Sequence, residues 1–206
     1  MTMLRERSEL AVTATGRAAP RPLGSWMIDP SHSSVSLTWR KHRLWTVTGR
    51  LHCFGVFRLD ALPPVGVVQF EQPSGLPVLT MALDPAGVET GDGNLDRRLR
   101  SPEVLDVQRH RWWTLRSEGL EIMPSGAWRV LAALTINGTS SLIGLRLELD
   151  PDASSADWLV LRGHGVLDRR AFGIGSPAST FSPEIRLDLS VRARRVAGPH
   201  PHREER

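Results

Sequence analysis

The feature that most constrains this chain is an alternation of apolar and polar residues with a period of two, which recurs between Ser34 and Arg192. Side chains on a β-strand point alternately to the two faces of a sheet, so this period is typical of strands with one buried face. In the segment 143–150, for example, four apolar residues alternate with Gly144, Arg146 and Glu148. The pattern predicts an all-β protein with about eight strands.

The predicted strands are 34–40, 47–59, 79–83, 112–117, 128–136, 143–150, 159–167 and 185–192. Turn-forming residues punctuate them at Asp29-Pro30, Pro63-Pro64, Asp84-Pro85, Pro124-Ser125-Gly126, Asn137-Gly138 and Asp150-Pro151. Because polar residues 139–141 follow Asn137-Gly138, the loop there is expected to exceed a two-residue hairpin turn.

One segment departs from the alternation. Leu95 and Leu99 are four residues apart among charged neighbours, which predicts a single short helix over Gly93–Ser101, ended by Pro102. Many antiparallel strands with short links fit either an up-and-down barrel or a sandwich. In a barrel the apolar residues would point inward, where about eight strands leave room for side chains or one small ligand.

The charge is distributed unevenly. The formal charge of +4 divides into +2 for residues 1–25, +3 for residues 192–206 and −1 for the rest. We interpret 1–25 as a disordered leader, 26–195 as the barrel domain and 196–206 as a disordered tail. A basic character confined to the ends argues against a specific nucleic-acid partner.

Neither a membrane span nor a secretion signal is expected. No apolar run approaches the roughly 18–20 residues of a transmembrane helix, and Arg5, Glu6, Arg7 and Glu9 interrupt the N-terminal segment. These observations predict a cytoplasmic protein without a transmembrane segment. Its single cysteine, Cys53, excludes an intrachain disulfide.

Five segments together resemble the YceI-like family over nearly all of residues 26–195. They are Trp26–Val35, Val47–Leu51, Thr90–Val107, Leu134–Gly138 and Asp168–Ile174. The chain departs from the family pattern at Leu95, Arg98, Val104-Leu105, His110-Arg111 and Ala171, and the stretch from about Ala61 to Gly75 looks inserted.

The resemblance implies an antiparallel, eight-stranded lipocalin-like barrel whose elongated cavity holds a polyisoprenoid or an isoprenoid quinone. It further implies that the chain is no enzyme, but carries or sequesters an apolar, isoprenoid-type lipid, with a homodimer as a possible assembly. From strand parity we expect these residues to line the cavity: Val35, Leu37, Trp39, Val47, Leu51, Leu83, Trp113 and Leu115. An anionic head group would bind to Arg50, Arg98 and Arg100.

The sequence gives little support for a metal site, a cofactor or a catalytic centre. The histidines show no metal-ligand spacing, and no cofactor or catalytic residue is expected. Asp168 and Arg169 predict a structural ion pair that closes the barrel, with a head-group contact as the alternative, and Asp29 and His32 predict a local turn hydrogen bond. Two functional alternatives remain: an isomerase or cyclase that uses the same cavity, and a filled barrel that serves as a protein-binding module.

Overall fold

The computed structural model describes residues 22–41, 45–174 and 181–196. Most of the predicted leader and tail lies outside these ranges, although the first strand already begins at Gly24. In chain order the elements are β1 (Gly24–Ile28), η1 (Pro30–His32), β2 (Ser34–Lys41), β3 (Trp45–Leu59), β4 (Val68–Gln69), β5 (Leu79–Glu89), α1 (Gly93–Arg100), β6 (Trp113–Ile122), β7 (Trp128–Ile136), β8 (Thr139–Leu149), β9 (Trp158–Asp168), η2 (Arg169–Phe172) and β10 (Phe181–Arg195).

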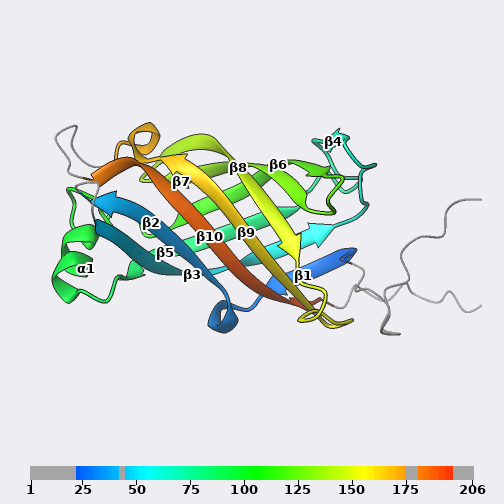
Figure 1. Ribbon diagram of the computed structural model, residues 1–206, viewed down its shortest axis with the longest axis horizontal. Helices are drawn as coiled ribbons and strands as arrows, with labels where there is room; N and C mark the ends of the chain where they lie inside the picture. Colours follow the sequence, from blue (N-terminus) through cyan, green and yellow to red (C-terminus); the bar gives the residue numbers. More distant parts are fainter. Residues whose placement is uncertain (1–21, 42–44, 175–180, 197–206) are drawn as a thin grey trace, which may run out of the picture.

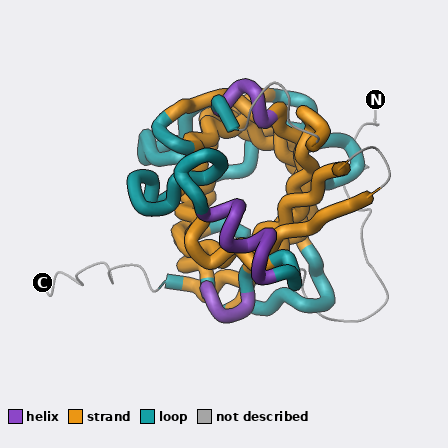
Figure 2. Tube along the Cα trace, turned by 90° about the vertical axis from the view of Figure 1, so that its left-hand side faces the viewer, coloured by secondary structure: helices purple, strands orange, loops and turns teal. Residues whose placement is uncertain are grey.

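Eight strands form a closed antiparallel ring in the order β2-β3-β5-β6-β7-β8-β9-β10, and β10 pairs with β2 to complete it. The view along the barrel in Figure 2 shows this ring with a helix across one end. The prediction of an all-β, eight-stranded, lipocalin-like barrel with one short helix is confirmed. Two strands lie outside the ring: β1 pairs with β10 and β3, and β4 pairs with β6.

Period-two alternation decides which side chains fill the barrel. Along β7, Trp128, Val130, Ala132, Leu134 and Ile136 are all buried, and the residues between them face outward. Each inward Leu or Val stabilises the fold by roughly 1.5–3 kcal/mol relative to an exposed position. The same parity along β2, β5, β6, β9 and β10 produces one continuous apolar core inside the ring.

Helix α1 closes one end of the barrel (Figures 1 and 2). Asp92 caps its N-terminus, because the Asp92 carboxylate accepts hydrogen bonds from the backbone amides of Asn94 and Leu95 at 2.9 and 3.2 Å. Leu99 is buried in the core, whereas Arg97 and Arg98 face solvent. The predicted helix is confirmed, and it ends one residue before the predicted boundary, at Arg100.

The turn predicted at Asn137-Gly138 is confirmed, but the expectation of a longer loop there is wrong. Ile136 pairs directly with Thr139, so Asn137-Gly138 is a two-residue hairpin turn and residues 139–141 belong to β8. Asn137 and Gly138 have φ of 50° and 78°, the left-handed conformation that this tight turn requires and that both residue types accept. The polar residues after the turn lie on a strand end that faces solvent, which is why they look like loop.

Strand β5 does not turn at Asp84-Pro85. It continues to Glu89, and its pairing with β3 shifts register between the pairs His52–Asp84 and Arg50–Glu89. Proline lacks an amide proton and is tolerated in strands at such irregularities. The bulge absorbs Pro85 without ending the strand.

The stretch that looks inserted forms an excursion, residues 60–78, at the end of the barrel opposite α1 (Figure 1). The buried Gln72 side chain holds it together: Gln72 Oε1 accepts from the Asp60 amide at 2.8 Å, and Nε2 donates to the carbonyls of Arg58 and Leu76. The excursion exposes six large apolar side chains to solvent: Leu62, Val65, Val67, Val68, Phe70 and Leu76.

The close pairing of β8 with β9 generates a prediction. A Cβ on Gly165 would lie 2.8 Å from the Gly144 carbonyl oxygen and 2.7 Å from Leu145 Cδ2, so Gly165→Ala should lower the free energy of unfolding by about 1–3 kcal/mol. Gly144→Ala is the matched control, because its Cβ meets no atom within 4 Å. Urea denaturation of both variants measures the difference, and equal stabilities would contradict the packing described.

Candidate ligand-binding site

The centre of the barrel is lined only by apolar side chains. Eleven residues surround the central cavity: Val35, Leu37, Met81, Leu83, Trp113, Leu115, Leu134, Ile136, Leu167, Leu187 and Leu189. They come from six strands: β2, β5, β6, β7, β9 and β10. On each strand they are inward-facing residues. No titratable side chain lies in this lining. The surroundings therefore favour an apolar group and disfavour charge.

The structure brings five of the eight predicted lining residues together on the cavity wall: Val35, Leu37, Leu83, Trp113 and Leu115. Trp39 and Leu51 are buried elsewhere in the same core, and Val47 is partly buried against it. Sequence reasoning missed Met81 of β5 and the lining residues of β7, β9 and β10. Their alternation carried the same signal, so strand parity alone could have found them. That any of these residues binds a ligand stays a prediction.

Side chains fill most of the barrel. The central cavity has a volume of about 10 Å³, which is the lower limit for one water molecule. Two tryptophans contribute much of the filling: Trp113 is 2% exposed at the cavity wall, and Trp128 stacks on Phe57 with ring centroids 5.6 Å apart. A long ligand can therefore enter the centre only if interior side chains move apart.

The three predicted head-group cations do not form one site. Arg50 lies on the outer face of β3, beside Ser36, Glu148 and Arg162, and Arg98 is exposed on α1. Arg100 alone reaches the barrel end, where its Nη2 donates to the Val88 carbonyl at 2.7 Å. Its Nε is buried and has no hydrogen-bond partner among the described residues.

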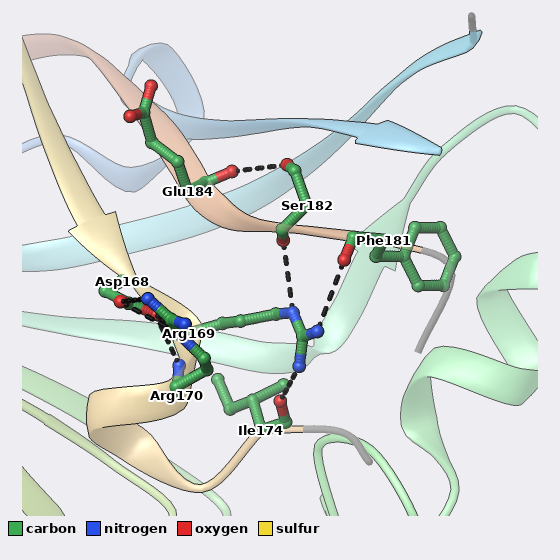
Figure 3. A network of polar contacts seen from close by, with 7 residues as sticks. All are labelled: Asp168, Arg169, Arg170, Ile174, Phe181, Ser182 and Glu184. Atoms are coloured by element: carbon green, nitrogen blue, oxygen red, sulfur yellow. Dashed lines mark hydrogen bonds and ion pairs between the residues drawn. The ribbon is translucent and has the colours of Figure 1, made fainter. Parts of the chain in front are cut away.

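Arg169 is the buried charged side chain of this region, and its partners differ from those predicted (Figure 3). The Arg169 guanidinium donates to three backbone carbonyls: Ile174 at 2.6 Å, Ser182 at 3.1 Å and Phe181 at 3.2 Å. Thus Arg169 ties the segment after β9 to the start of β10. The predicted Asp168–Arg169 ion pair is wrong.

Asp168 turns instead to Arg170, whose Nη2 lies 2.6 Å from Asp168 Oδ2. The hydrogen bonds from Arg170 hold the pKa of Asp168 down to about 2. Both side chains are exposed. Asp168 is the last residue of β9, and Arg170 lies in η2, which follows it. Such an exposed pair contributes little to stability.

Asp29 and His32 form the local turn that the sequence predicts. Asp29 Oδ1 accepts a hydrogen bond from the Ser31 amide at 3.0 Å, and Asp29 Oδ2 lies 2.8 Å from His32 Nδ1. The hydrogen bond with His32 is the main cause that lowers the pKa of Asp29. Asp29 caps η1, whose last residue is His32, and both lie outside the lining of the central cavity.

Neither a metal centre nor an activated nucleophile emerges from the part of the chain that the structure describes. Within it, no three His, Cys, Asp or Glu side chains come together in a way that could hold a metal ion. Cys53 is buried, and its burial raises the pKa of the thiol to about 12. Its thiol is therefore protonated at neutral pH and a poor nucleophile. None of the described helices is long and apolar enough to span a membrane.

These observations define a class of protein: a lipocalin-like barrel with an apolar interior and a helix across one end. The chain belongs to the YceI-like family, because the model of the YceI-like domain matches residues 26–193. The resemblance inferred from the five sequence segments is thereby confirmed. No curated protein shows significant similarity to the chain.

Solved structures share the fold at low identity. BcnA from Burkholderia cenocepacia aligns with a TM-score of 0.62 and 17% identity, over 80% of this chain and 98% of that one. A polyisoprenoid binding domain from Saccharophagus degradans, implicated in plant cell wall breakdown, aligns with a TM-score of 0.61 and 12% identity, over 83% and 98% of the two chains. The Campylobacter jejuni YCEI protein aligns with a TM-score of 0.52 and 18% identity, over 68% of this chain and 92% of that one.

The contrast between the two neighbouring arginines generates a prediction. Arg169→Met keeps the length of the side chain but removes the donors to three carbonyls, so the free energy of unfolding should fall by about 3 kcal/mol. Arg170→Met removes only an exposed ion pair and should leave stability unchanged within error. Chemical denaturation of both variants tests this, and equal losses would refute the anchoring role of Arg169.

The buried thiol generates a second prediction. Burial raises the pKa of the Cys53 thiol from 9.0 to about 12. The free energy of unfolding should therefore be unaffected by this group below pH 9, and it should fall as the pH rises from 9 toward 12, because the unfolded chain loses the thiol proton more readily. At pH 8 the native protein should react with a thiol-specific disulfide reagent only through the small fraction of molecules that is open at equilibrium. Labelling should therefore accelerate in urea in proportion to the unfolded fraction. Rapid labelling of the native protein without urea would contradict the burial.

Proposed function

We propose that this protein binds an apolar, isoprenoid-type amphiphile inside its barrel, and that it carries or sequesters this lipid without catalysing a reaction on it. The observation that carries the proposal is the cavity lining, which is apolar throughout and contributes no titratable group. Membership of the YceI-like family and the likeness to a polyisoprenoid binding domain support the same ligand class.

The energetics are compatible with such a ligand. An isoprenoid tail that buries roughly 600 Å² of apolar surface gains about 15 kcal/mol in gross terms, at ~25 cal/mol per Å². Association and ordering consume a large part of this gain. With a cavity of only about 10 Å³, some of the remainder must be used to move interior side chains apart. Binding is therefore expected to be coupled to widening of the barrel, and slower than diffusion allows.

The helix end of the barrel is the better candidate for the head group. Arg100 is half-buried there, with its Nε unpaired among the described residues. Arg98 lies on the solvent face of the same helix and could contact the outer part of a head group. Arg50 lies on the outer wall of β3 and has no place in this arrangement. A cytoplasmic location and a homodimer stay predictions.

A second candidate function is a filled barrel that acts as a protein-binding module. The small volume of the central cavity favours it, because barrels of about eight strands are often filled by side chains alone. Under this alternative the interior serves stability only. Uptake of lipid distinguishes the two candidates.

Native mass spectrometry of protein purified without detergent, followed by organic extraction, tests the proposal. We expect a co-purifying lipid at near-unit stoichiometry, or uptake of phylloquinone or geranylgeraniol when either is added. Added lipid should also raise the melting temperature, because it binds only the folded barrel. Bare protein that takes up neither lipid would refute the carrier function and favour the protein-binding module.

A further inference from the structure

Exposed apolar side chains are concentrated at the end of the barrel opposite α1 (Figure 1). Among the described residues twelve large apolar side chains are exposed, and six of them belong to the excursion. Leu23 and Val196 add two more at the same end: Gly24 pairs with Leu59, the residue before the excursion, and the Val196 amide donates to the Ser25 carbonyl at 2.8 Å. Such a concentration on one part of a surface marks a place where another apolar phase or molecule binds.

Backbone pairing holds the side chains of the excursion outward. Strand β4 pairs with β6, and Val65 forms a bridge with Ile122 at the end of β6. Val65 and Phe70, which lie on either side of β4, are the most exposed of the eight apolar residues at this end, at 62% and 68%. The excursion is therefore attached to the barrel wall while its apolar side chains face solvent.

The segments that enter and leave the barrel at this end carry the positive charge of the chain. Residues 1–25 have a net formal charge of +2 and residues 192–206 of +3, against −1 for the remainder. Both segments meet the barrel here, where Arg195 Nη1 donates to the Leu23 carbonyl at 3.2 Å. The excursion itself carries Asp60 and Glu71 and no cation, so the two flanking segments supply the positive charge.

A lipid bilayer fits this end better than a folded protein does. The eight apolar side chains come from three separate stretches: the excursion, the residue before β1 and the residue after β10. Hot spots of protein interfaces are seated in well-packed pockets, whereas the hollow between the excursion and β6 has a volume of only about 10 Å³. A bilayer needs no matching pocket, because apolar side chains enter its acyl region while cations attract anionic head groups.

We propose that the excursion end of the barrel docks on the surface of an anionic lipid bilayer. Val65 and Phe70 enter the apolar layer, and the basic residues that flank the barrel, among them the exposed Arg194, contact the head groups. This inference concerns the outer surface of the protein. It goes beyond the proposed function and does not depend on what the interior of the barrel holds.

Co-sedimentation of the full-length protein with lipid vesicles tests the proposal. The protein should bind vesicles of phosphatidylcholine mixed with phosphatidylglycerol more tightly than vesicles of phosphatidylcholine alone. Val65→Ser combined with Phe70→Ser should lower the affinity for the mixed vesicles at least about tenfold, because both side chains lose their transfer from water to an apolar phase. Leu142→Ser combined with Val166→Ser is the matched control and should keep the affinity, since these residues are 60% and 52% exposed on β8 and β9, outside the excursion end.

Several outcomes would overturn the docking proposal. One is a wild-type protein that binds neither kind of vesicle, and another is an equal loss in the two double variants. Undiminished binding of the excursion variant would show that the basic segments act alone. A dimer in sedimentation velocity that only the excursion variant abolishes, without vesicle binding, would assign the patch to a second copy of the chain. Vesicle binding by a protein that takes up neither phylloquinone nor geranylgeraniol would refute the carrier function and leave the docking proposal standing.

A fluorescent label reports insertion directly. The protein has one cysteine, the buried Cys53, so Phe70→Cys offers a single exposed thiol for an environment-sensitive fluorophore. Its emission should shift to the blue when mixed vesicles are added, and brominated lipids should quench it. The same label on Leu142→Cys should respond much less. Equal responses at the two positions would contradict docking through the excursion.

Discussion

Everything inside this protein depends on the closure of the barrel by β10. This strand is 15 residues long and pairs with β9 on one side and with β2 and β1 on the other. Without it the inward row of β2 would face solvent, and the ring would become an open sheet with two exposed edges. Gly163 and Gly165 on β9 allow the wall to close tightly, because leucine side chains of β8 occupy the space where their Cβ atoms would lie.

Dense packing inside the closed wall has two opposite effects. It stabilises the folded barrel, and it opposes the entry of a ligand. The buried aromatic residues, Trp113 and Trp128 among them, leave a cavity of only about 10 Å³. The two ends also differ: helix α1 and partly buried arginine lie at one, and the excursion with its exposed apolar side chains lies at the other. A ligand inside such a barrel would have to displace packed side chains.

Period-two alternation was enough to predict the class, the eight strands of the ring and most of the core, because burial on one face leaves a direct record in the sequence; it did not predict β1 and β4. It failed for the turn at Asp84-Pro85 and for the length of the loop at Asn137-Gly138, because backbone pairing with another strand decides both. It placed five lining residues on the cavity wall, but local parity cannot say at which level of the barrel Trp39 or Leu51 lies. The partners of Arg169 were missed because they are backbone carbonyls, one just after η2 and two at the start of β10, and a carbonyl leaves no side-chain signal in the sequence.

The anchoring of Arg169 by carbonyls has a consequence for how the barrel tolerates acid. A salt bridge at this place would fail once its carboxylate gained a proton, whereas a peptide carbonyl has nothing to titrate and an arginine stays charged throughout. The three hydrogen bonds by which Arg169 joins the segment after β9 to the start of β10 therefore do not depend on a carboxylate. Acid that protonates Asp168 would break the exposed Asp168–Arg170 ion pair. The hydrogen bonds from Arg169 to the three carbonyls would stay in place.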